Sequence, residues 1–330
     1  TSLLNHMLKF TIKFLFLLSP KRFPIALILV FIHSNLIISQ TINELGSPFV
    51  KNFSKKEIKN GFKVFDISQD DNGEIYFAKP GFLMQYDGFS WRNYSTKDQS
   101  DLRAVLYDDT DHIYTAGIGG FGFWFKNDKG ILEYSSLYFK YPTKKAPLLP
   151  VFLNIVSANG VIYFQSFQQI YIYNPNNSEL NTVPAIKGFS KLFSSNDRVF
   201  VQDVSIGLFK IIDNQKKIIN GSENLSLNII EVFETKKKGL IIATKNNGFW
   251  FLENGLLKKK QWKINTEIEK SIVTDVEKYI NDLFIVGTLR DGFYIISNEG
   301  QKLAHFNKNN GISNNAIRKI FVDNNHNIWL

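Results

Sequence analysis

A unit of about 40 residues recurs along this chain and constrains its fold more than any other feature. The last copy is the clearest. From Ala316 to Val322 apolar and polar residues alternate, Asp323 to Asn327 are turn formers, and Ile328 opens a second apolar strand, which predicts a β-hairpin. Aligned on Trp329, the earlier copies have anchors spaced by 37 to 49 residues, at Ile285, Ile241, Phe200, Tyr163, Tyr114 and Tyr76. Such self-similarity is typical of a propeller or a solenoid.

Each copy contains the parts of four short strands. An apolar strand and a polar turn precede the anchor strand, and an aromatic-rich third strand follows, as in Gly248 to Leu252 and Gly292 to Ile296. A second turn and a more polar fourth strand complete the unit, and no helical pattern of useful length occurs after residue 40. These patterns predict an all-β fold, a β-propeller of four-stranded blades over residues 41–330, with six full repeats and the start of a seventh. The incomplete last repeat predicts a truncated chain.

The composition is consistent with this fold and bears on the partners. Aromatic residues make up 15% of the chain and favour half-buried, pleated surfaces. The absence of cysteine excludes disulfides and cysteine metal sites, but neither requires nor forbids an oxidising compartment. Despite a net charge of +9, the lysines occur singly or in short clusters where turns and outer strands are predicted. We interpret them as solvated residues that protect edge strands, and we expect no nucleic-acid partner.

Residues 1–40 have the parts of an export signal. The stretch from Met7 to Arg22 contains lysines and an arginine among apolar residues. An apolar run then extends from Ile25 to Ile32, and the small residue Ser39 follows. The run is short for a spanning helix, which needs about 20 apolar residues. Cleavage near Ser39 or Gln40 is therefore preferred to an uncleaved anchor, and a buried helix ranks third. Residues 1–6 precede the first Met, which leaves open whether they belong to the natural product.

The last repeats resemble a known family. Gly311 to Asn315, followed by Asp323 to Trp329, is similar to the Gly-Leu-Ser-x-Asn segment and the Asp-x-x-Gly-x-Ile-Trp hairpin of the two-component regulator propeller repeat. Gly287-Thr288 with Asp291-Gly292-Phe293 resembles the Gly-Thr and Gly-Phe elements that follow in that family. The resemblance covers residues 41–330 and is weakest in the third and fourth copies, where Gln165 and Gln202 replace a small residue.

The resemblance implies a location and a role. The segment from Ile42 to Phe49 looks like the opening of exported sensors that carry a triple-tyrosine domain. Members of this kind continue through further blades, that domain, one membrane helix, and a cytoplasmic histidine kinase or helix-turn-helix output. The resemblance therefore implies the exported, periplasmic or extracellular sensor region of a membrane-tethered regulator.

No catalytic or cofactor-binding pattern is visible in the sequence. The five histidines are isolated and lack the paired spacing of a metal site, and His112 and His326 occupy the same turn of two repeats. The acidic turn from Asp70 to Glu74 lacks the twelve-residue frame of a calcium loop. The glycine-rich stretch from Gly119 to Gly122 has no following helix to receive a phosphate. We expect no catalytic residue, metal or cofactor in this region.

Propeller geometry predicts where a binding site would lie. Loops between second and third strands share one face with the connections between blades, and together they ring the central channel. Polar candidates on the first kind of loop are Lys79, Gln165, Asp203, Lys245 and Arg290, and those on the second kind are Arg103, Ser313, Asn314 and Asn315. Phe121 or Phe167 would offer a stacking face for a polar ligand such as an oligosaccharide.

These observations support a ranked set of functions. The first is an extracytoplasmic sensor propeller that binds a polar ligand or a downstream domain of the same protein. The second is a secreted or surface-attached propeller that mediates protein contacts without a signalling output. A propeller hydrolase or lyase is third, because no cluster of acids or metal ligands is visible. The ligand, the output module and a homodimeric state are left open.

Overall fold

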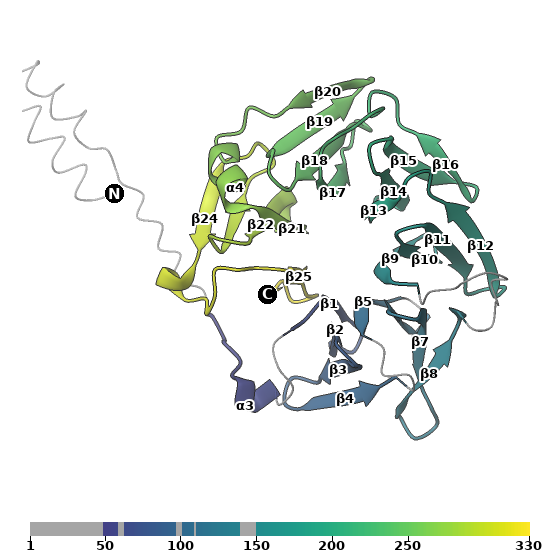
Figure 1. The fold of residues 1–330 in the computed structure, drawn as a ribbon. Coiled ribbons are helices and arrows are strands. Elements are labelled where there is room, and N and C mark those ends of the chain that lie inside the picture. Colours follow the sequence, from purple (N-terminus) through teal and green to yellow (C-terminus); the bar gives the residue numbers. More distant parts are fainter. Residues whose placement is uncertain (1–48, 59–62, 97–100, 109, 139–149) are drawn as a thin grey trace, which may run out of the picture. The chain divides into compact units, whose positions relative to one another are not determined.

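Six four-stranded antiparallel sheets follow one another along the chain (Figure 1). The computed structural model describes residues 49–58, 63–96, 101–108, 110–138 and 150–330, so the predicted export signal over residues 1–40 lies outside the described residues. A two-stranded sheet of β25 (Phe321–Val322) and β26 (Ile328–Trp329) follows them. The predicted all-β propeller of six full repeats and the start of a seventh is thereby confirmed.

Each blade is a simple meander whose strands pair in chain order. The first three blades contain, in order, β1 (Asp66–Gln69), β2 (Ile75–Lys79), β3 (Phe82–Tyr86) and β4 (Trp91–Ser95); β5 (Leu102–Tyr107), β6 (Ile113–Gly117), β7 (Gly120–Lys126) and β8 (Leu132–Ser136); and β9 (Phe152–Ala158), β10 (Val161–Ser166), β11 (Gln169–Asn174) and β12 (Glu179–Pro184). The next three contain β13 (Phe189–Ser195), β14 (Arg198–Asp203), β15 (Gly207–Ile212) and β16 (Gln215–Ile218); β17 (Ile229–Glu234), β18 (Leu240–Thr244), β19 (Phe249–Glu253) and β20 (Leu256–Lys259); and β21 (Val273–Tyr279), β22 (Leu283–Thr288), β23 (Phe293–Ile296) and β24 (Lys302–Phe306).

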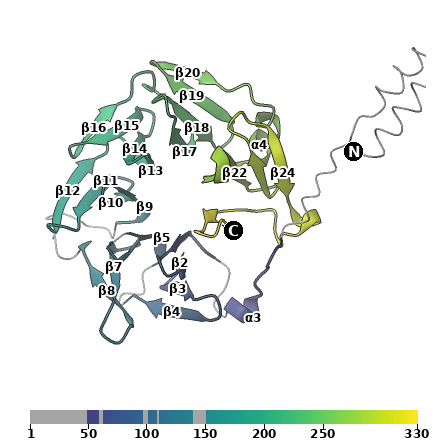
Figure 2. The same ribbon diagram turned by 180° about the vertical axis from the view of Figure 1, so that it is seen from behind.

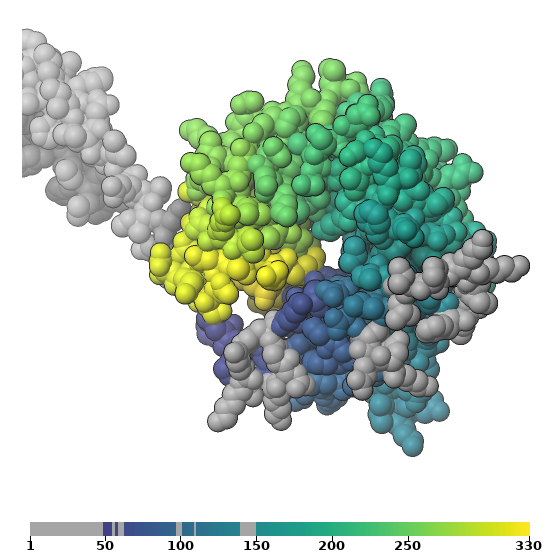
Figure 3. Space-filling model, in the orientation of Figure 1, coloured from purple at the N-terminus to yellow at the C-terminus, as the bar shows by residue number. Residues whose placement is uncertain are grey.

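The blades stand around a common centre, with the first strand of each blade innermost and the fourth outermost (Figures 1 and 2). The seventh position holds β25 (Phe321–Val322) and β26 (Ile328–Trp329). Ile320, just before β25, packs with blade 6, whereas Trp329 packs with blade 1 and stacks on Phe53 at 6.0 Å between ring centroids. In the space-filling view the yellow end of the chain accordingly adjoins the purple and blue first blade (Figure 3).

An aspartate organises the hairpin turn that defines the repeat. The carboxylate of Asp323 accepts hydrogen bonds from the backbone N–H groups two and four residues on, at 2.9 and 2.8 Å, and from the indole N–H of Trp329 at 2.9 Å. Asp70 makes the same two backbone contacts at 3.0 and 2.9 Å and accepts the hydroxyl of Tyr76 at 3.0 Å. The spacing of six residues between the aspartate and the aromatic residue therefore indicates a turn that the aspartate closes with hydrogen bonds.

A hydroxyl closes the loop between the second and third strands. Thr288 donates to the carbonyl of Gly292 at 2.8 Å and accepts the N–H three residues on at 3.0 Å, and Thr244 makes the equivalent pair. Gly292 has φ +68°, and a Cβ there would lie 1.9 Å from the carbonyl oxygen of Phe306, so only glycine fits. In blade 3, where the family resemblance is weak, the hydroxyl of Ser166 closes a shorter loop, because it donates to the carbonyl of Gln169 at 2.9 Å and accepts the N–H of the same residue at 3.0 Å.

Polar side chains of the innermost strands link neighbouring blades. The carboxylate of Asp66 accepts the N–H of Val105 in blade 2 at 3.0 Å, and the amide of Asn154 donates to a blade 4 carbonyl at 2.7 Å. Asp275 accepts the N–H of Ile320 at 2.9 Å. These side chains therefore supply hydrogen bonds to backbone groups of the next blade, whose strands do not pair with their own sheet.

Short helices occupy connections: α3 (Lys55–Ile58), α4 (Asn265–Ser271), η2 (Ile280–Asp282) and η3 (Lys308–Asn310). The helix α4 lies between blades 5 and 6, and Asn265 ties it to blade 5 by accepting the N–H of Phe249 at 3.0 Å. Over the described ranges, no helix is long and apolar enough to cross a membrane.

Candidate functional site at the channel mouth

The two ends of the ring differ in the loops that they carry. We call the end with the second-to-third strand loops and the interblade connections the loop end, and the end with the other turns the turn end. Antiparallel pairing in every blade places seven of the candidate residues at the loop end: Lys79, Arg103, Gln165, Asp203, Lys245, Arg290 and Asn314. Their accessibility differs widely.

Three of these candidates are buried and have structural contacts. The carboxylate of Asp203, which is 0% exposed, accepts three backbone N–H groups and the ammonium of Lys216. Gln165, also 0% exposed, donates to the carbonyls of Ser166 and Phe189 at 3.1 and 3.2 Å. Lys79 is 1% exposed, with its ammonium 5.4 Å from the ring centroid of Phe82. Since these side chains are enclosed, a ligand could reach them only after a rearrangement of the loops.

The other four candidates lie nearer the surface. The guanidinium of Arg103 lies 4.1 Å from the ring centroid of Phe65, and its Nε is buried without a hydrogen-bond partner. Lys245 is exposed, Arg290 donates to a backbone carbonyl at 3.4 Å, and the exposed Asn314 accepts a backbone N–H at 3.0 Å. Their roles in binding stay predictions.

The two predicted stacking faces have opposite outcomes. The prediction for Phe121 is wrong, because its ring is 0% exposed and stacks on Phe164 at 4.2 Å inside the core between blades 2 and 3. Phe167 is 53% exposed in the loop between β10 and β11, over Gly188. The alternation of apolar residues in the sequence could not separate these cases, because Phe121 is buried by a neighbouring blade.

A group of charged side chains at the centre of the ring was not predicted. We call it the channel cluster, and its members are Asp66, Lys191, Glu231, Asp275, Glu277 and Lys319. Lys191 of blade 4 lies 3.3 Å from Glu231 of blade 5 and 3.6 Å from Asp275 of blade 6. Because blade 5 lies between blades 4 and 6, Lys191 and Asp275 can meet only at the centre of the ring. Lys319 lies 3.2 Å from Asp275 and 3.3 Å from Glu277.

The channel cluster contains four carboxylates and two ammonium groups in a partly enclosed space. Its side chains range from 3% exposed at Asp275 to 35% exposed at Glu277, so water or a small ligand can reach some of them. Burial raises the pKa of Glu277 to about 7, and the charges of Asp275 and Glu231 add to the rise. Burial opposes the charge on Lys319, yet the surrounding carboxylates hold its pKa well above the usual value.

Replacing Glu277 with Gln should change how stability depends on pH. The folded-state pKa of Glu277 is raised from 4.5 to about 7, so the folded protein retains a proton that the unfolded chain loses. This group therefore lowers the wild-type free energy of unfolding as pH rises from about 4.5 to 7. We expect E277Q to gain on the order of 1 kcal/mol relative to wild type between pH 5 and 8, a value reduced for solvent screening.

The measurement is urea unfolding of both proteins at several pH values in that range. Asp275, Glu231, Lys191 and Lys319 face Glu277 and are unchanged in the variant. A difference in unfolding free energy that is constant from pH 5 to 8 would show that Glu277 is ionised throughout.

A signal for the channel cluster does exist in the sequence. The residues nine or ten positions before each anchor form one column of the repeat alignment, and six of the seven are charged or amide residues within apolar strands: Asp66, Ala104, Asn154, Lys191, Glu231, Asp275 and Lys319. Register shifts next to this column in most blades accompany the departure from simple alternation.

Among the described residues, no group of three or more His, Asp or Glu side chains could hold a metal ion.

No protein-family model and no curated protein matches this chain. Among solved structures, it is similar to the extracellular domain of a B. thetaiotaomicron protein described as the hybrid two-component system BT3049, at 15% identity and a TM-score of 0.64, over 86% of this chain and 40% of that one. The extracellular domain of BT4673 from B. thetaiotaomicron matches at 18% identity and a TM-score of 0.60, over 81% and 36%. Virginiamycin B lyase from Staphylococcus aureus matches at 9% identity and a TM-score of 0.57, over 76% and 84%.

These similarities concern the fold. The same propeller architecture occurs in these extracellular domains and in a lyase, so architecture does not by itself select a function. The chain spans between a third and two fifths of the length of the two extracellular domains that it matches. This chain has the propeller fold found in the extracellular domains of hybrid two-component systems.

Proposed function

We propose that this chain is the extracytoplasmic sensor propeller of a membrane-bound signalling regulator, and that it binds a polar ligand at the loop end of the central channel. The observation that carries the proposal is the channel cluster. Its carboxylates outnumber its ammonium groups, so oxygen lone pairs remain to accept hydrogen bonds from hydroxyl or ammonium groups. Partly exposed members such as Glu231 and Glu277 lie where a ligand could reach them.

An oligosaccharide has the matching chemistry. Its hydroxyl groups would donate to the carboxylates of the channel cluster, and the exposed ring of Phe167 at the loop end offers an apolar face to a sugar ring. For signalling, the ligand must favour one of two arrangements of the receptor, which requires a difference in affinity between them. The fold shared with extracellular domains of two-component systems supports this role by analogy.

Ligand binding is tested by titration calorimetry with neutral and acidic oligosaccharides. We expect Glu231→Gln and Phe167→Ala each to weaken the best ligand about tenfold, which is about 1.4 kcal/mol. Phe89, which is 98% exposed in a turn at the opposite end, provides the control substitution Phe89→Ala. A ligand that binds all four proteins equally would contradict a site at the loop end.

The signalling part is tested by the gene beyond codon 330. A kinase or helix-turn-helix module after a membrane helix is expected, and a stop codon soon after a seventh blade would contradict the proposal.

An apolar surface favours a second candidate function, a docking face for protein. Five large apolar side chains at the loop end are between 39% and 61% exposed: Val151, Leu153, Phe167, Ile186 and Val204. Three of these side chains are close to Gly188. The ring of Phe167 covers Gly188, and the N–H of Val204 donates to the carbonyl of Gly188 at 2.8 Å. Ile186 lies two residues before Gly188 in the chain. Contiguous apolar surface of this kind often marks protein contacts. Light scattering of wild type and Ile186→Lys would reveal self-association through this face.

A further inference from the structure

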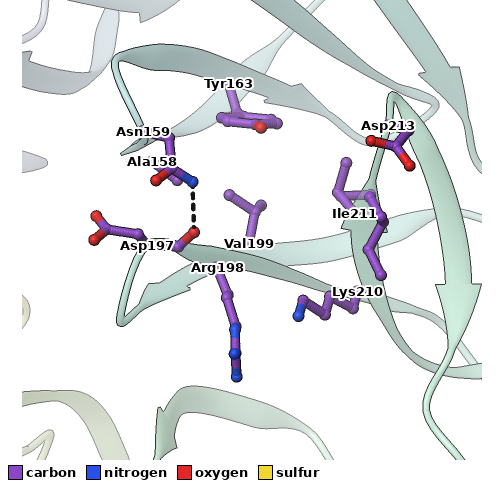
Figure 4. Close-up of a pocket in the computed structure, with 10 residues that line it drawn as sticks. Ala158, Asn159, Tyr163, Asp197, Arg198, Val199, Lys210, Ile211 and Asp213 are labelled. Carbon is purple, nitrogen blue, oxygen red and sulfur yellow. Dashed lines mark hydrogen bonds between the residues drawn. The ribbon is translucent and has the colours of Figure 1, made fainter.

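A cavity of about 360 Å³ opens between blades 3 and 4 at the turn end, away from the channel mouth (Figure 4). It is lined by the turn between β9 and β10, the turn between β13 and β14, and the end of β15. The side-chain amide of Asn159 donates to the carbonyl of Asp197 at 2.9 Å, which ties the two turns together across the blade boundary. Two of the turns that border the cavity are therefore joined by a contact that needs no ligand.

Apolar side chains form the inner wall of this cavity. Val199 and Ile211 are buried in the core shared by blades 3 and 4, and Tyr163 packs against the same core. Burial raises the pKa of Tyr163, so its hydroxyl stays protonated and can donate a hydrogen bond. Within the described ranges, that hydroxyl makes no hydrogen bond. A polar group that entered the cavity would meet an available donor.

Lys210 is the second unusual group. It interrupts the otherwise apolar strand β15, and in Figure 4 its ammonium projects into the space beside Arg198. Within the described part of the chain, its ammonium forms no ion pair within 4.0 Å, although Asp197 and Asp213 line the same cavity. Burial and the nearby charge of Arg198 both lower its pKa. The carboxylate of Glu234 opposes this effect only in part, since the net pKa of Lys210 is lowered.

Arg198 is anchored to the neighbouring blade. Its guanidinium pairs with the carboxylate of Glu234, which is only 8% exposed, so the arginine is anchored to blade 5. That single carboxylate is shared by two nearby cations, because it also acts on Lys210. An oxyanion in the cavity would give Lys210 a close anionic partner at modest desolvation cost, since both cations are already partly desolvated.

We propose that this cavity is a binding site for an oxyanion, a carboxylate, sulfate or phosphate group, with Lys210 as the principal cation. Arg198 adds a second positive charge, and the Tyr163 hydroxyl donates a hydrogen bond. The site is separate from the proposed ligand site at the loop end, and it can exist whether or not that site does. The anion is either a free inorganic ion or a group carried by a larger organic molecule.

The test is titration of the wild-type protein with sodium sulfate, sodium phosphate and sodium glucuronate at constant ionic strength, followed by amide chemical shifts of the residues around the cavity. We expect saturable shifts at Asn159, Arg198 and Lys210, with a dissociation constant in the millimolar range or below. Lys210→Met should weaken binding at least tenfold, whereas Lys210→Arg should retain most of it. Tighter binding of glucuronate than of sulfate and phosphate would identify an organic ligand, and the reverse order would identify a free ion.

The matched control is Lys258→Met, which removes an exposed lysine from β20, the outer strand of the next blade. It changes the net charge by the same amount but leaves the cavity intact. Thermal unfolding of K210M verifies that the variant folds, and K210R keeps the test interpretable if it does not. Shifts that do not saturate with any of the three anions, or equal binding by K210M and K258M, would overturn the proposal.

Discussion

Replacing Asp203 with Ala is expected to lower the free energy of unfolding by about 3–5 kcal/mol. The carboxylate is fully buried and accepts the N–H groups of Ile186, Lys187 and Gly188 at 2.6, 2.9 and 3.1 Å, together with the Lys216 ammonium at 2.9 Å. Alanine would leave three backbone donors and one lysine without an acceptor. Guanidinium chloride unfolding at pH 7 measures the loss.

The pH dependence of this loss provides an internal check. Burial raises the pKa of Asp203, but the three N–H donors and Lys216 outweigh it, and the net pKa is lowered. The stability that the ionised group contributes is therefore present above the unfolded pKa and is lost as pH falls through the folded one. The difference between wild type and D203A should shrink below about pH 4.

Two further variants separate this explanation from general sensitivity of the fold. Asp203→Asn keeps one carbonyl oxygen as acceptor and should be intermediate. Asp128→Ala, at an exposed position in the turn after β7, should change stability by less than about 0.5 kcal/mol. A D203A protein as stable as D128A would show that the loop between blades 3 and 4 does not depend on the carboxylate.

Replacing Lys319 with Met is expected to lower the free energy of unfolding by about 3 kcal/mol at neutral pH. The ammonium lies 3.2 Å from Asp275, which is 3% exposed, and also pairs with Glu277 and Asp66. Without it, carboxylates at the centre of the ring lose their nearest positive charge. Protonation relieves part of that repulsion, so the loss should be smaller at pH 5 than at pH 8, as urea unfolding at the two values would show.

The control for this variant is another lysine that pairs closely with a carboxylate. Lys302 lies 2.7 Å from Glu267, but both side chains are more than 40% exposed. Surface pairs of this kind contribute about 0–1 kcal/mol, so Lys302→Met should be nearly neutral. Equal losses for K319M and K302M would mean that the channel cluster is screened by water like a surface pair.

Local signals predicted the architecture well. The turn aspartates Asp70 and Asp323 and the loop residue Thr288 act through contacts within seven residues of themselves, so their spacing in the sequence reports the structure directly. Six four-stranded blades follow from repeating these local units. The third blade was an exception in sequence, yet Ser166 shows that a different hydroxyl residue also closes this loop, in a shorter form.

Exposure was beyond the reach of local reasoning. The sequence placed Gln165, Asp203 and Phe167 on loops at the same end, but only the folded structure shows that the first two are buried and that Phe167 is accessible. Phe121 was predicted as a stacking face although a ring from another blade covers it. Burial of this kind depends on residues a whole repeat away.

The sequence by itself determined the repeat, the strand order within each blade and the turns that end the strands, because these depend on hydrogen bonds and side-chain alternation among near neighbours. Closing the ring decided the rest. Lys191 and Asp275 belong to blades 4 and 6 and meet only at the centre, and Lys210 meets Arg198 only where two strands of one blade pair. Both candidate sites thus arise from charges that are distant along the chain or hidden within apolar strands, and tertiary packing alone brings them together.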